Sequence, residues 1–464
     1  MQKQAHTQSA MHPTSAAGGP MSSAQTLHSS TTGGGYRGSE LASDLLTRLF
    51  RRLPMSLTLR LWNGAAVRVG AESGAQESPF ALVFLNPEVV STAVLGRDPL
   101  RLAEAYFRGD LDIEGDFFAA LALKDHLQTL QMSVGEQIGA AAAAMRLRAV
   151  NADRRPPRIQ WTPSHGQAVK DHSKAENRDA IHFHYDVSNE FYALWLDRAM
   201  VYSCAYFERP DLSLDAAQEA KLEHICRKLC LQPGERFLDI GCGWGALVIH
   251  AAQRYGVRAH GVTLSPQQLK VARERIAWAG LEDRVSVELQ DYRDLKGVYD
   301  KVASVGMFEH VGLKNLPVYF STVNRLLKPH GLFLNHGITH DSEGWQKSLS
   351  TEFINRYVFP DGQLDNISNV QHAMEAARFE IADVEALRPH YALTLRHWVE
   401  RLERNHARAL QYVNEATYRV WRLYMAACAL QFEAGDIGIY QVLAGKRAAG
   451  NLPLPLTRRH LYEH

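Results

Sequence analysis

The chain has 464 residues, of which 46% are hydrophobic, and a formal net charge of +1. This length allows two or three domains, and the near-neutral charge excludes a strong overall attraction to nucleic acid or to an anionic membrane. The five cysteines form neither a paired framework nor a zinc-ligand pattern, so we expect reduced thiols and no metal site. No stretch reaches the roughly 18 apolar residues of a transmembrane helix.

The first part of the chain changes character near residue 41. Residues 1–40 are rich in Ser, Thr, Gly and Ala, which predicts a disordered tail. Residues 41–134 carry helical and strand-like patterns, which predict a small α+β domain. In chain order we expect helix 41–53, strand 56–69, strand 80–84, helix 100–107, a turn at 109–115 and helix 117–123.

Residues 135–178 are predicted to form a basic linker. An Ala-rich helix at 139–150 runs into polar sequence, and residues 140–178 contain eight Lys and Arg against three Asp and Glu, a local charge of +5 (8 − 3). This excess fits two interpretations, contact with anionic lipid head groups or a solvated linker.

From residue 179 to 445, strand-like stretches alternate with helical ones, which predicts βαβ units, a parallel, doubly wound sheet and an α/β fold. Residues 394–445 have mostly helical spacing with many aromatic residues, and residues 446–464 are predicted as a C-terminal tail. In chain order we expect strand 237–240, helix 246–255, strand 259–264, helix 267–279, strand 285–289, strand 301–305, helix 317–327 and strand 332–335.

A glycine-rich turn follows the first of these strands. Gly241, Gly243 and Gly245 let the backbone turn sharply and approach a ligand at the carboxyl end of the strand, where α/β sheets bind ligands. Asp239 at the strand end can hold a cationic amine. The spacing matches neither the dinucleotide fingerprint nor a Walker loop but resembles motif I of Rossmann-like methyltransferases. Tight strand-to-helix turns also use glycine without any ligand.

The next two strand ends carry the remaining cofactor candidates. Thr263, Leu264 and Gln268 occupy the place where a dinucleotide site has an acidic residue. After the third strand, Asp291 could accept a hydrogen bond from an adenine amine, and Tyr292 could cover the base, beside Arg293. For Asp291 alone, a helix or turn cap is the plain alternative.

Five ordered segments are more specific than the glycine turn: residues 183–192, 200–207, 305–312, 335–338 and 390–395. They resemble the cyclopropane-fatty-acid synthases and mycolic acid cyclopropane synthases, over about residues 175–445. The resemblance implies a Rossmann-like class I methyltransferase domain with helical substrate-binding insertions. It implies transfer of a methylene unit from S-adenosylmethionine to the cis double bond of an unsaturated phospholipid acyl chain.

The same resemblance implies a cytoplasmic enzyme peripheral to the inner face of the membrane, and it allows a homodimer. It implies that Tyr202 and Ser203 join the cofactor site. It further implies a bound bicarbonate as base, in a cradle that maps onto Cys204, Glu309, His336, Ile338 (through its backbone) and Tyr391.

Each of these residues has a plain alternative when it stands alone, such as packing for a buried cysteine. Cys428 matches a family cysteine once regarded as the active-site residue, and in an apolar helix we favour packing over catalysis. Aromatic residues of the C-terminal helices fit either an acyl channel or ordinary core. They are Trp398, Tyr412, Tyr418, Trp421, Tyr424 and Phe432.

Three other functions stay open at this point. Methyl-branching of an acyl chain keeps the cofactor and the lipid but needs no ring closure. Methylation of nitrogen in a small amine keeps only the cofactor. A non-catalytic lipid-binding protein on a degenerate methyltransferase domain predicts broken glycines or a missing Glu309 and His336 pair, whereas all are present.

Overall fold

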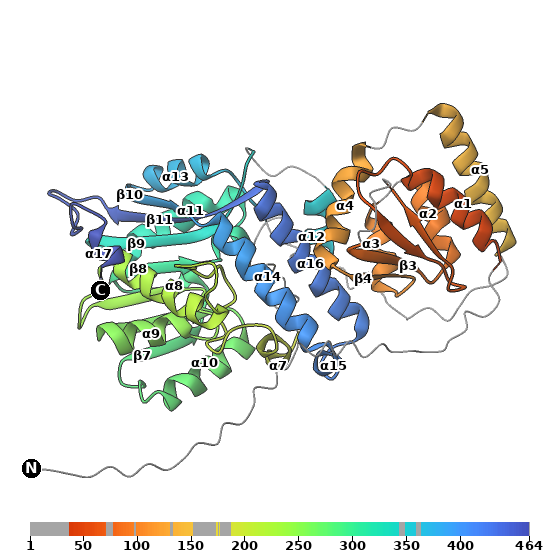
Figure 1. The fold of residues 1–464 in the computed structure, drawn as a ribbon. Helices are drawn as coiled ribbons and strands as arrows, with labels where there is room; N and C mark the ends of the chain where they lie inside the picture. The colour runs from red at the N-terminus through yellow and green to blue at the C-terminus, as the bar shows by residue number, and fades with distance from the viewer. Residues whose placement is uncertain are drawn as a thin grey trace, which may run out of the picture.

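The computed structural model describes residues 37–70, 78–96, 99–129, 133–151, 173–174, 176, 187–342, 349–358 and 363–463. They form two units, an N-terminal unit with a small sheet and helices, and a larger α/β body (Figure 1). Two long helices of the larger body, α14 and α16, lie next to the N-terminal unit. Most of the predicted tail, residues 1–36, lies outside the described residues. The first helix, α1, begins at Ser39.

The N-terminal unit is built on a four-stranded sheet with the order β2-β1-β3-β4. Strand β1 pairs with β3 in parallel, whereas the pairs β1–β2 and β3–β4 are antiparallel. Helices and strands bury one shared apolar core, as the patterns predicted. The elements are α1 (Ser39–Phe50), β1 (Leu57–Arg60), β2 (Ala66–Val69), β3 (Phe80–Phe84), α2 (Pro87–Gly96), α3 (Pro99–Phe107), β4 (Leu111–Gly115), α4 (Phe117–Thr129) and α5 (Val134–Val150).

Three predictions in this unit need correction. The strand expected at 56–69 is a hairpin, because the chain reverses near Gly64, whose φ of 84° favours glycine. The turn expected at 109–115 contains strand β4, which pairs with β3 along its whole length. The linker expected from residue 135 begins with helix α5, which packs on α1 and α2 and buries Ala140, Ala144 and Leu147.

The larger body contains a seven-stranded sheet with the order β10-β11-β9-β8-β5-β6-β7. Strands β5 to β9 pair in parallel, and β11 is antiparallel to both of its neighbours. The strands are β5 (Arg236–Ile240), β6 (Arg258–Thr263), β7 (Val285–Leu289), β8 (Tyr299–Val305), β9 (Leu327–His340), β10 (Phe379–Ala386) and β11 (Ile437–Lys446). The α/β fold and its mostly parallel sheet are therefore confirmed.

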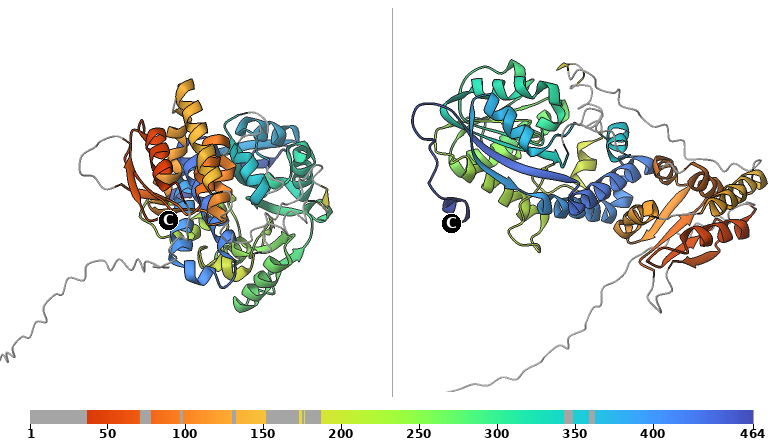
Figure 2. Two further views of the ribbon diagram at one scale, coloured as in Figure 1. Left: turned by 90° about the vertical axis from the view of Figure 1, so that its right-hand side faces the viewer. Right: turned by 90° about the horizontal axis from the view of Figure 1, so that it is seen from above.

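Helices cover both faces of this sheet (Figures 1 and 2). One buried cluster joins the strands to α8, α9 and α10, and another joins them to α11 and α13. The helices are α7 (Asn189–Ala193), α8 (Leu214–Lys228), α9 (Ala246–Tyr255), α10 (Pro266–Trp278), α11 (Leu316–Leu326), α12 (Leu349–Tyr357), α13 (Ile367–Ala376), α14 (Arg388–Arg404), α15 (His406–Ala409), α16 (Glu415–Ala434) and α17 (Arg459–Tyr462), with short 3-10 helices η1 (Tyr292–Asp294), η2 (Phe308–His310) and η3 (Leu313–Asn315).

The C-terminal part, residues 394–445, is helical only as far as Ala434. Helices α14 and α16 follow the prediction, whereas the end of the stretch, Ile437–Lys446, is strand β11. It is a strand because it fills the gap between β9 and β10 and buries most of its side chains there. The predicted tail is also packed, since Leu461 of α17 is buried and α17 contacts α8.

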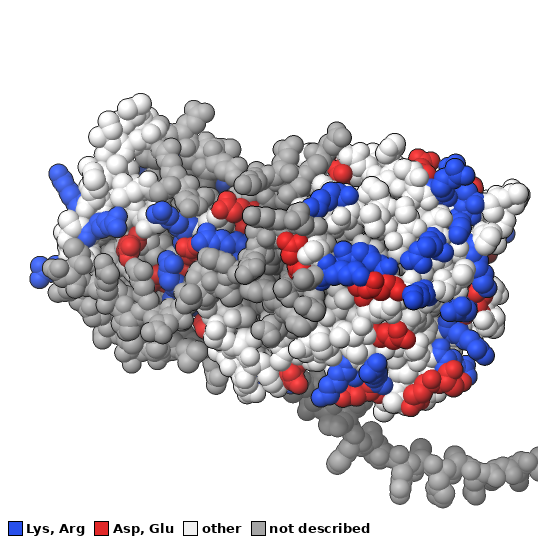
Figure 3. All heavy atoms as spheres, turned by 180° about the vertical axis from the view of Figure 1, so that it is seen from behind, with Lys and Arg blue, Asp and Glu red and all other residues white. Residues whose placement is uncertain are grey.

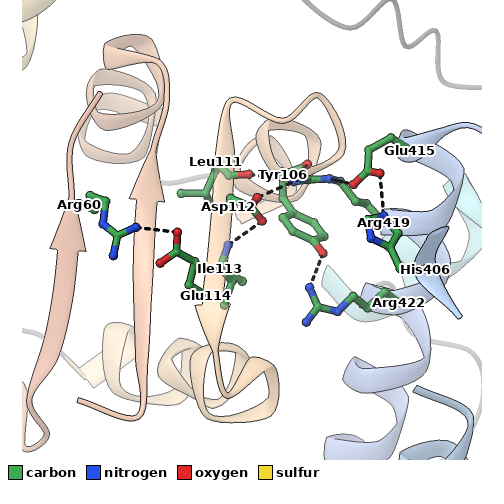
Figure 4. Close-up of polar contacts among 10 residues, drawn as sticks. All are labelled: Arg60, Tyr106, Leu111, Asp112, Ile113, Glu114, His406, Glu415, Arg419 and Arg422. Carbon is green, nitrogen blue, oxygen red and sulfur yellow. Dashed lines mark hydrogen bonds and ion pairs between the residues drawn. The ribbon is translucent and has the colours of Figure 1, made fainter. Parts of the chain in front are cut away.

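Two arginines of α16 tie the units together (Figure 4). The Arg419 guanidinium donates to the carbonyl oxygens of Tyr106 and Leu111 and contacts the Asp112 carboxylate at 3.1 Å. Arg422 donates to the Tyr106 hydroxyl at 3.2 Å and lies 3.8 Å from the centre of the Phe117 ring. The N-terminal unit therefore contacts the helices that, as shown below, also border a cavity of the larger body.

The surface shows no single charge character. Seen from behind, Lys and Arg are interspersed with Asp and Glu over the larger body (Figure 3), which agrees with the small net charge. None of the helices among the described residues is both long and apolar enough to cross a membrane.

Candidate active site

A first cavity of about 1160 Å³ opens at the carboxyl ends of β5, β6 and β8. This is the edge where parallel sheets bind ligands. Most predicted cofactor residues line it: Tyr202, Ser203, Asp239, Gly241, Gly243, Thr263, Leu264, Gln268, Asp291 and Tyr292.

Asp239 at the end of β5 has an unused hydrogen-bond acceptor. Its Oδ1 is buried and has no partner among the described residues. Burial raises the pKa of Asp239 to about 7, although the positive charge of Lys221 partly opposes the shift. A buried carboxylate oxygen without a donor is costly, so this atom fits a ligand that supplies a cationic or hydroxyl donor.

The glycine turn brings its backbone against this cavity. Gly241 has a φ of 83° and Gly243 a φ of 54°, both in the left-handed region that favours glycine. Gly245 does not line the cavity. It caps α9, and a Cβ there would lie 3.2 Å from the Ala272 Cβ, so Gly245 serves the packing of α9 on α10.

The loop after β6 is fixed by its own polar groups. The Thr263 hydroxyl donates to Gln268 Oε1 at 2.7 Å and accepts from the Ser265 amide at 3.2 Å. Ser265 caps α10 by accepting from the Gln268 amide. These bonds hold Thr263 and Gln268 at the cavity wall without an acidic residue.

Asp291 is a cap as well as a cavity residue. It accepts from the Arg293 backbone amide at 2.9 Å and from both sides of the Arg293 guanidinium, at 2.8 and 2.7 Å. Burial works in the opposite direction, but these hydrogen bonds lower the pKa of Asp291. Arg293 is not among the lining residues. Its guanidinium holds Asp291, and its predicted cofactor contact stays a prediction.

A second cavity of about 1080 Å³ adjoins the first and shares Tyr202, Ser203, Gly306 and His310 with it. The structure places all six predicted catalytic residues in its wall: Cys204, Glu309, His336, Ile338, Tyr391 and Cys428. Apolar side chains from β11, α12, α14 and α16 complete the lining, namely Ile354, Leu395, Phe432, Ile437 and Ile439.

Glu309 is held by β9. Its Oε1 accepts from the Ile338 backbone amide at 2.7 Å, and its Oε2 is buried without a partner among the described residues. Burial raises the pKa of Glu309. The Ile338 amide, expected as a donor to bicarbonate, thus donates to Glu309. Gly337 permits this approach, because a Cβ there would lie 1.9 Å from Phe308 Cε1.

His336 presents one free ring nitrogen. Its Nδ1 lies 3.2 Å from the side-chain amide nitrogen of Gln441, and its Nε2 is buried with no partner among the described residues. Burial, together with the nearby charges of Lys221 and Lys228, lowers the pKa of His336 well below its usual value. The ring is therefore neutral, and with Gln441 donating to Nδ1 the proton resides on Nε2.

The two cysteines of the second cavity are protonated thiols. Burial raises the pKa of Cys204, whose Sγ lies 3.2 Å from the Ala205 carbonyl oxygen, and raises the pKa of Cys428 to about 12. A thiol with such a pKa is a poor nucleophile. This supports packing, rather than nucleophilic catalysis, as the role of Cys428.

Some aromatic residues of the C-terminal helices line the cavity, as expected for an acyl channel, and others belong to the ordinary core. Tyr424 and Phe432 line the second cavity. Trp398, Tyr418 and Trp421 are core residues, in a cluster that also contains Trp195, and Tyr412 is 43% exposed. Periodicity alone did not separate these groups.

Sequence reasoning gave no individual role to four residues in or next to the site: Gln218, Lys221, Gly337, which lies in the recognised segment 335–338, and Gln441. Residues 183–186 of the first family segment lie outside the described residues. Among those described, no cluster of three or more His, Cys, Asp and Glu is placed to hold a metal ion.

Comparison with known proteins agrees with this geometry. The family model for mycolic acid cyclopropane synthetase matches residues 172–442. A probable fatty acid methyltransferase of Pseudomonas putida is 40% identical over 88% of this chain and 97% of its own length. The cyclopropane-fatty-acyl-phospholipid synthase of Escherichia coli is 42% identical over 58% of this chain and 68% of its own.

A solved structure gives the same result for the fold. Mycolic acid cyclopropane synthase CmaA1, complexed with SAH and CTAB, superposes with a TM-score of 0.56 at 35% identity, over 58% of this chain and 98% of its own. The match of the family model to more than half of the chain, at the cavities described above, shows that this chain belongs to the mycolic acid cyclopropane synthetase family, as an enzyme that uses S-adenosylmethionine.

Proposed function

We propose that the enzyme adds a methylene unit from S-adenosylmethionine to the cis double bond of an unsaturated phospholipid acyl chain, forming a cyclopropane. The observation that carries the proposal is the second cavity. It joins the cofactor cavity at Tyr202 and Ser203, and it combines apolar walls with a buried Glu309 and His336.

The reaction depends on contact between the alkene and the sulfonium methyl group, and on exclusion of water, more than on a strong nucleophile. An alkene has no acidic proton, so the chain must hold it against the sulfonium methyl group. Transfer forms a carbon–carbon bond, breaks the carbon–sulfur bond and leaves a carbocation. Loss of one proton from the new methyl group and a second carbon–carbon bond then close the ring.

The proton must go to a base that is not one of the cavity's thiols, because both are protonated. We propose that bicarbonate binds here and supplies that base. The residues fit an anion: His336 Nε2–H is an unused donor, and the raised pKa of Glu309 favours its neutral, hydrogen-donating form. Tyr391 in the same wall adds a hydroxyl group.

The lipid substrate implies work at a membrane surface. We propose that the protein is cytoplasmic and meets its substrate peripherally, at the inner face of the membrane. The apolar side of the second cavity, with Leu395 and Phe432, suits an acyl chain drawn from a bilayer.

Methyl-branching is the second candidate, and one observation favours it. The Pseudomonas putida relative that matches almost its full length to this chain is a probable fatty acid methyltransferase. Methyl-branching would use the same two cavities but leave the ring open.

The proposed role of Glu309 is tested with Glu309→Gln. Gln preserves the size of the side chain but can neither release nor take up a proton, so it cannot share a proton with the bound anion. We therefore expect turnover to be abolished while S-adenosylhomocysteine binds nearly as before. The matched control is Glu274→Gln, an exposed carboxylate on α10, which should keep wild-type turnover. Both variants are incubated with vesicles of cis-unsaturated phospholipid and labelled S-adenosylmethionine. Loss of cofactor binding in Glu309→Gln would show that its role is misassigned.

A further inference from the structure

Lys221 is a charged side chain that sequence reasoning left unassigned. It lies on α8, is only 1% exposed and lines the first cavity. A lysine is almost never fully buried unless it has a partner. Its buried position at the cavity wall therefore indicates that its ammonium group has a partner there.

The ammonium group of Lys221 determines the direction of a neighbouring hydroxyl. Its Nζ donates to Ser203 Oγ at 2.8 Å. An ammonium group has donors only, so Ser203 Oγ must accept this bond, and its own proton must point elsewhere. One turn earlier on α8, the Gln218 amide donates to the Ser203 carbonyl oxygen at 2.8 Å, which fixes the same residue from behind.

The charges around Lys221 leave room for another anion. Of its acidic neighbours, Asp197 is engaged by backbone amides, because its two oxygens accept from Ala199 and Val201 at 2.8 Å each. Asp239 has an unused oxygen that fits a cationic group. Burial lowers the pKa of Lys221 to about 8, against the opposing effect of these carboxylates, so Lys221 is still mostly protonated near pH 7.

We propose that Lys221 is a positioning residue that makes Ser203 an obligate hydrogen-bond donor to the carboxylate of the methionine end of S-adenosylmethionine. The ammonium group of that same end then lies toward Asp239. The inference rests on the cofactor assignment but not on the identity of the lipid product. It predicts that this end of the cavity selects ligands that carry a carboxylate.

The test compares two probes on the full chain by isothermal titration calorimetry: S-adenosylmethionine and its decarboxylated analogue. Wild type should bind the carboxylate-bearing probe roughly tenfold to one hundredfold more tightly, the range expected for hydrogen bonds to a charged group. Lys221→Met should lose most of this preference, and so should Ser203→Ala. The double variant should lose little more than either single variant, because both act on one interaction.

Controls separate positioning from folding. Lys270→Met removes an exposed lysine of α10 and should keep the wild-type preference. If Lys221→Met weakens both probes equally, the role is merely structural and the proposal fails. If Lys221→Met keeps a preference for S-adenosylmethionine within about twofold of the wild-type preference, the proposal also fails, because the loss of the hydrogen bond should reduce it by much more. If wild type binds neither probe, the cofactor assignment itself is wrong.

Discussion

Gly337→Ala should disable the enzyme through a single methyl group. The added Cβ would lie 1.9 Å from Phe308 Cε1 and 3.1 Å from Glu309 Oε1, whereas ordinary contacts begin at 3.4 Å. Something must therefore move by about 1.5 Å (3.4 − 1.9). Phe308 is 2% exposed in the core and cannot swing into solvent, so the short helix η2 must shift and carry Glu309 with it.

The expected magnitudes follow from the size of this shift. Overpacking of a core costs about 1–3 kcal/mol of unfolding free energy. Misplacing a reacting group by about 1 Å costs roughly one hundredfold in turnover. We expect both losses in Gly337→Ala, measured by urea unfolding and by product formation on lipid vesicles. Binding of S-adenosylhomocysteine should change less than turnover, because His310 is the one η2 residue that lines the first cavity, whereas Asp239 and the glycine turn belong to β5 and the loop after it.

Gly139→Ala is the matched control. Gly139 lies inside helix α5, and a Cβ there would meet nothing within 4 Å. This substitution should raise stability by about 0.5–1 kcal/mol through helix propensity and leave turnover unchanged. The reasoning is refuted if Gly337→Ala unfolds at the same urea concentration as wild type and turns over at the wild-type rate.

Three further predictions concern charge and contact. Because the folded-state pKa of Asp239 is raised to about 7, the folded protein binds the extra proton, and its stability should fall as the pH rises from about 4 to 7. In urea unfolding at a series of pH values, the unfolding free energy of Asp239→Asn should not show this fall. If it falls in parallel with that of wild type, the raised pKa of Asp239 is contradicted. Cys428→Ala should keep turnover within about threefold of wild type, since a thiol with a pKa of about 12 supplies no thiolate, and a loss of one hundredfold would restore a catalytic role. Arg422→Ala should lower the unfolding free energy by about 2–3 kcal/mol, because it removes the contacts to Tyr106 and Phe117 between the units and the ion pair with Glu403 inside the larger body. An unchanged melting temperature would show that these contacts are weak.

The sequence predicted the elements whose pattern is local. Helix 246–255 and strand 285–289 match the structure, because the apolar periodicity of each is local, and Gly245 and Gly256 also mark the two ends of the helix. Strands β4 and β11 were missed, since each exists only through pairing with strands distant in the chain. The Ala-rich helix predicted at 139–150 is present as α5, but its packing on α1 and α2, which joins it to the N-terminal unit and not to a linker, depends on contacts distant in the chain.

The site residues also divide into those that local sequence identifies and those that only the structure reveals. Asp239, Glu309 and His336 were found because their neighbours along the chain form recognisable segments. Lys221 carries no such signal, because a lysine in a helix is ordinary until a partner is placed opposite it. Gly337 lies in the recognised segment 335–338, but its role appears only when Phe308 is placed opposite it. The resemblance placed Arg293 beside Tyr292 in the cofactor site but did not indicate its ion pair with Asp291, which only the structure shows.

The central claim is ring formation on a lipid acyl chain, and the most direct measurement is the proton NMR spectrum of the product. The purified protein is incubated with vesicles of cis-unsaturated phospholipid and S-adenosylmethionine, and the released fatty acid esters are examined. We predict that olefinic signals are replaced by cyclopropane ring signals, with a gain of one CH2 in mass. A methyl or methylene branch in place of the ring would instead establish methyl-branching. An unchanged acyl chain beside a methylated amine would contradict the account.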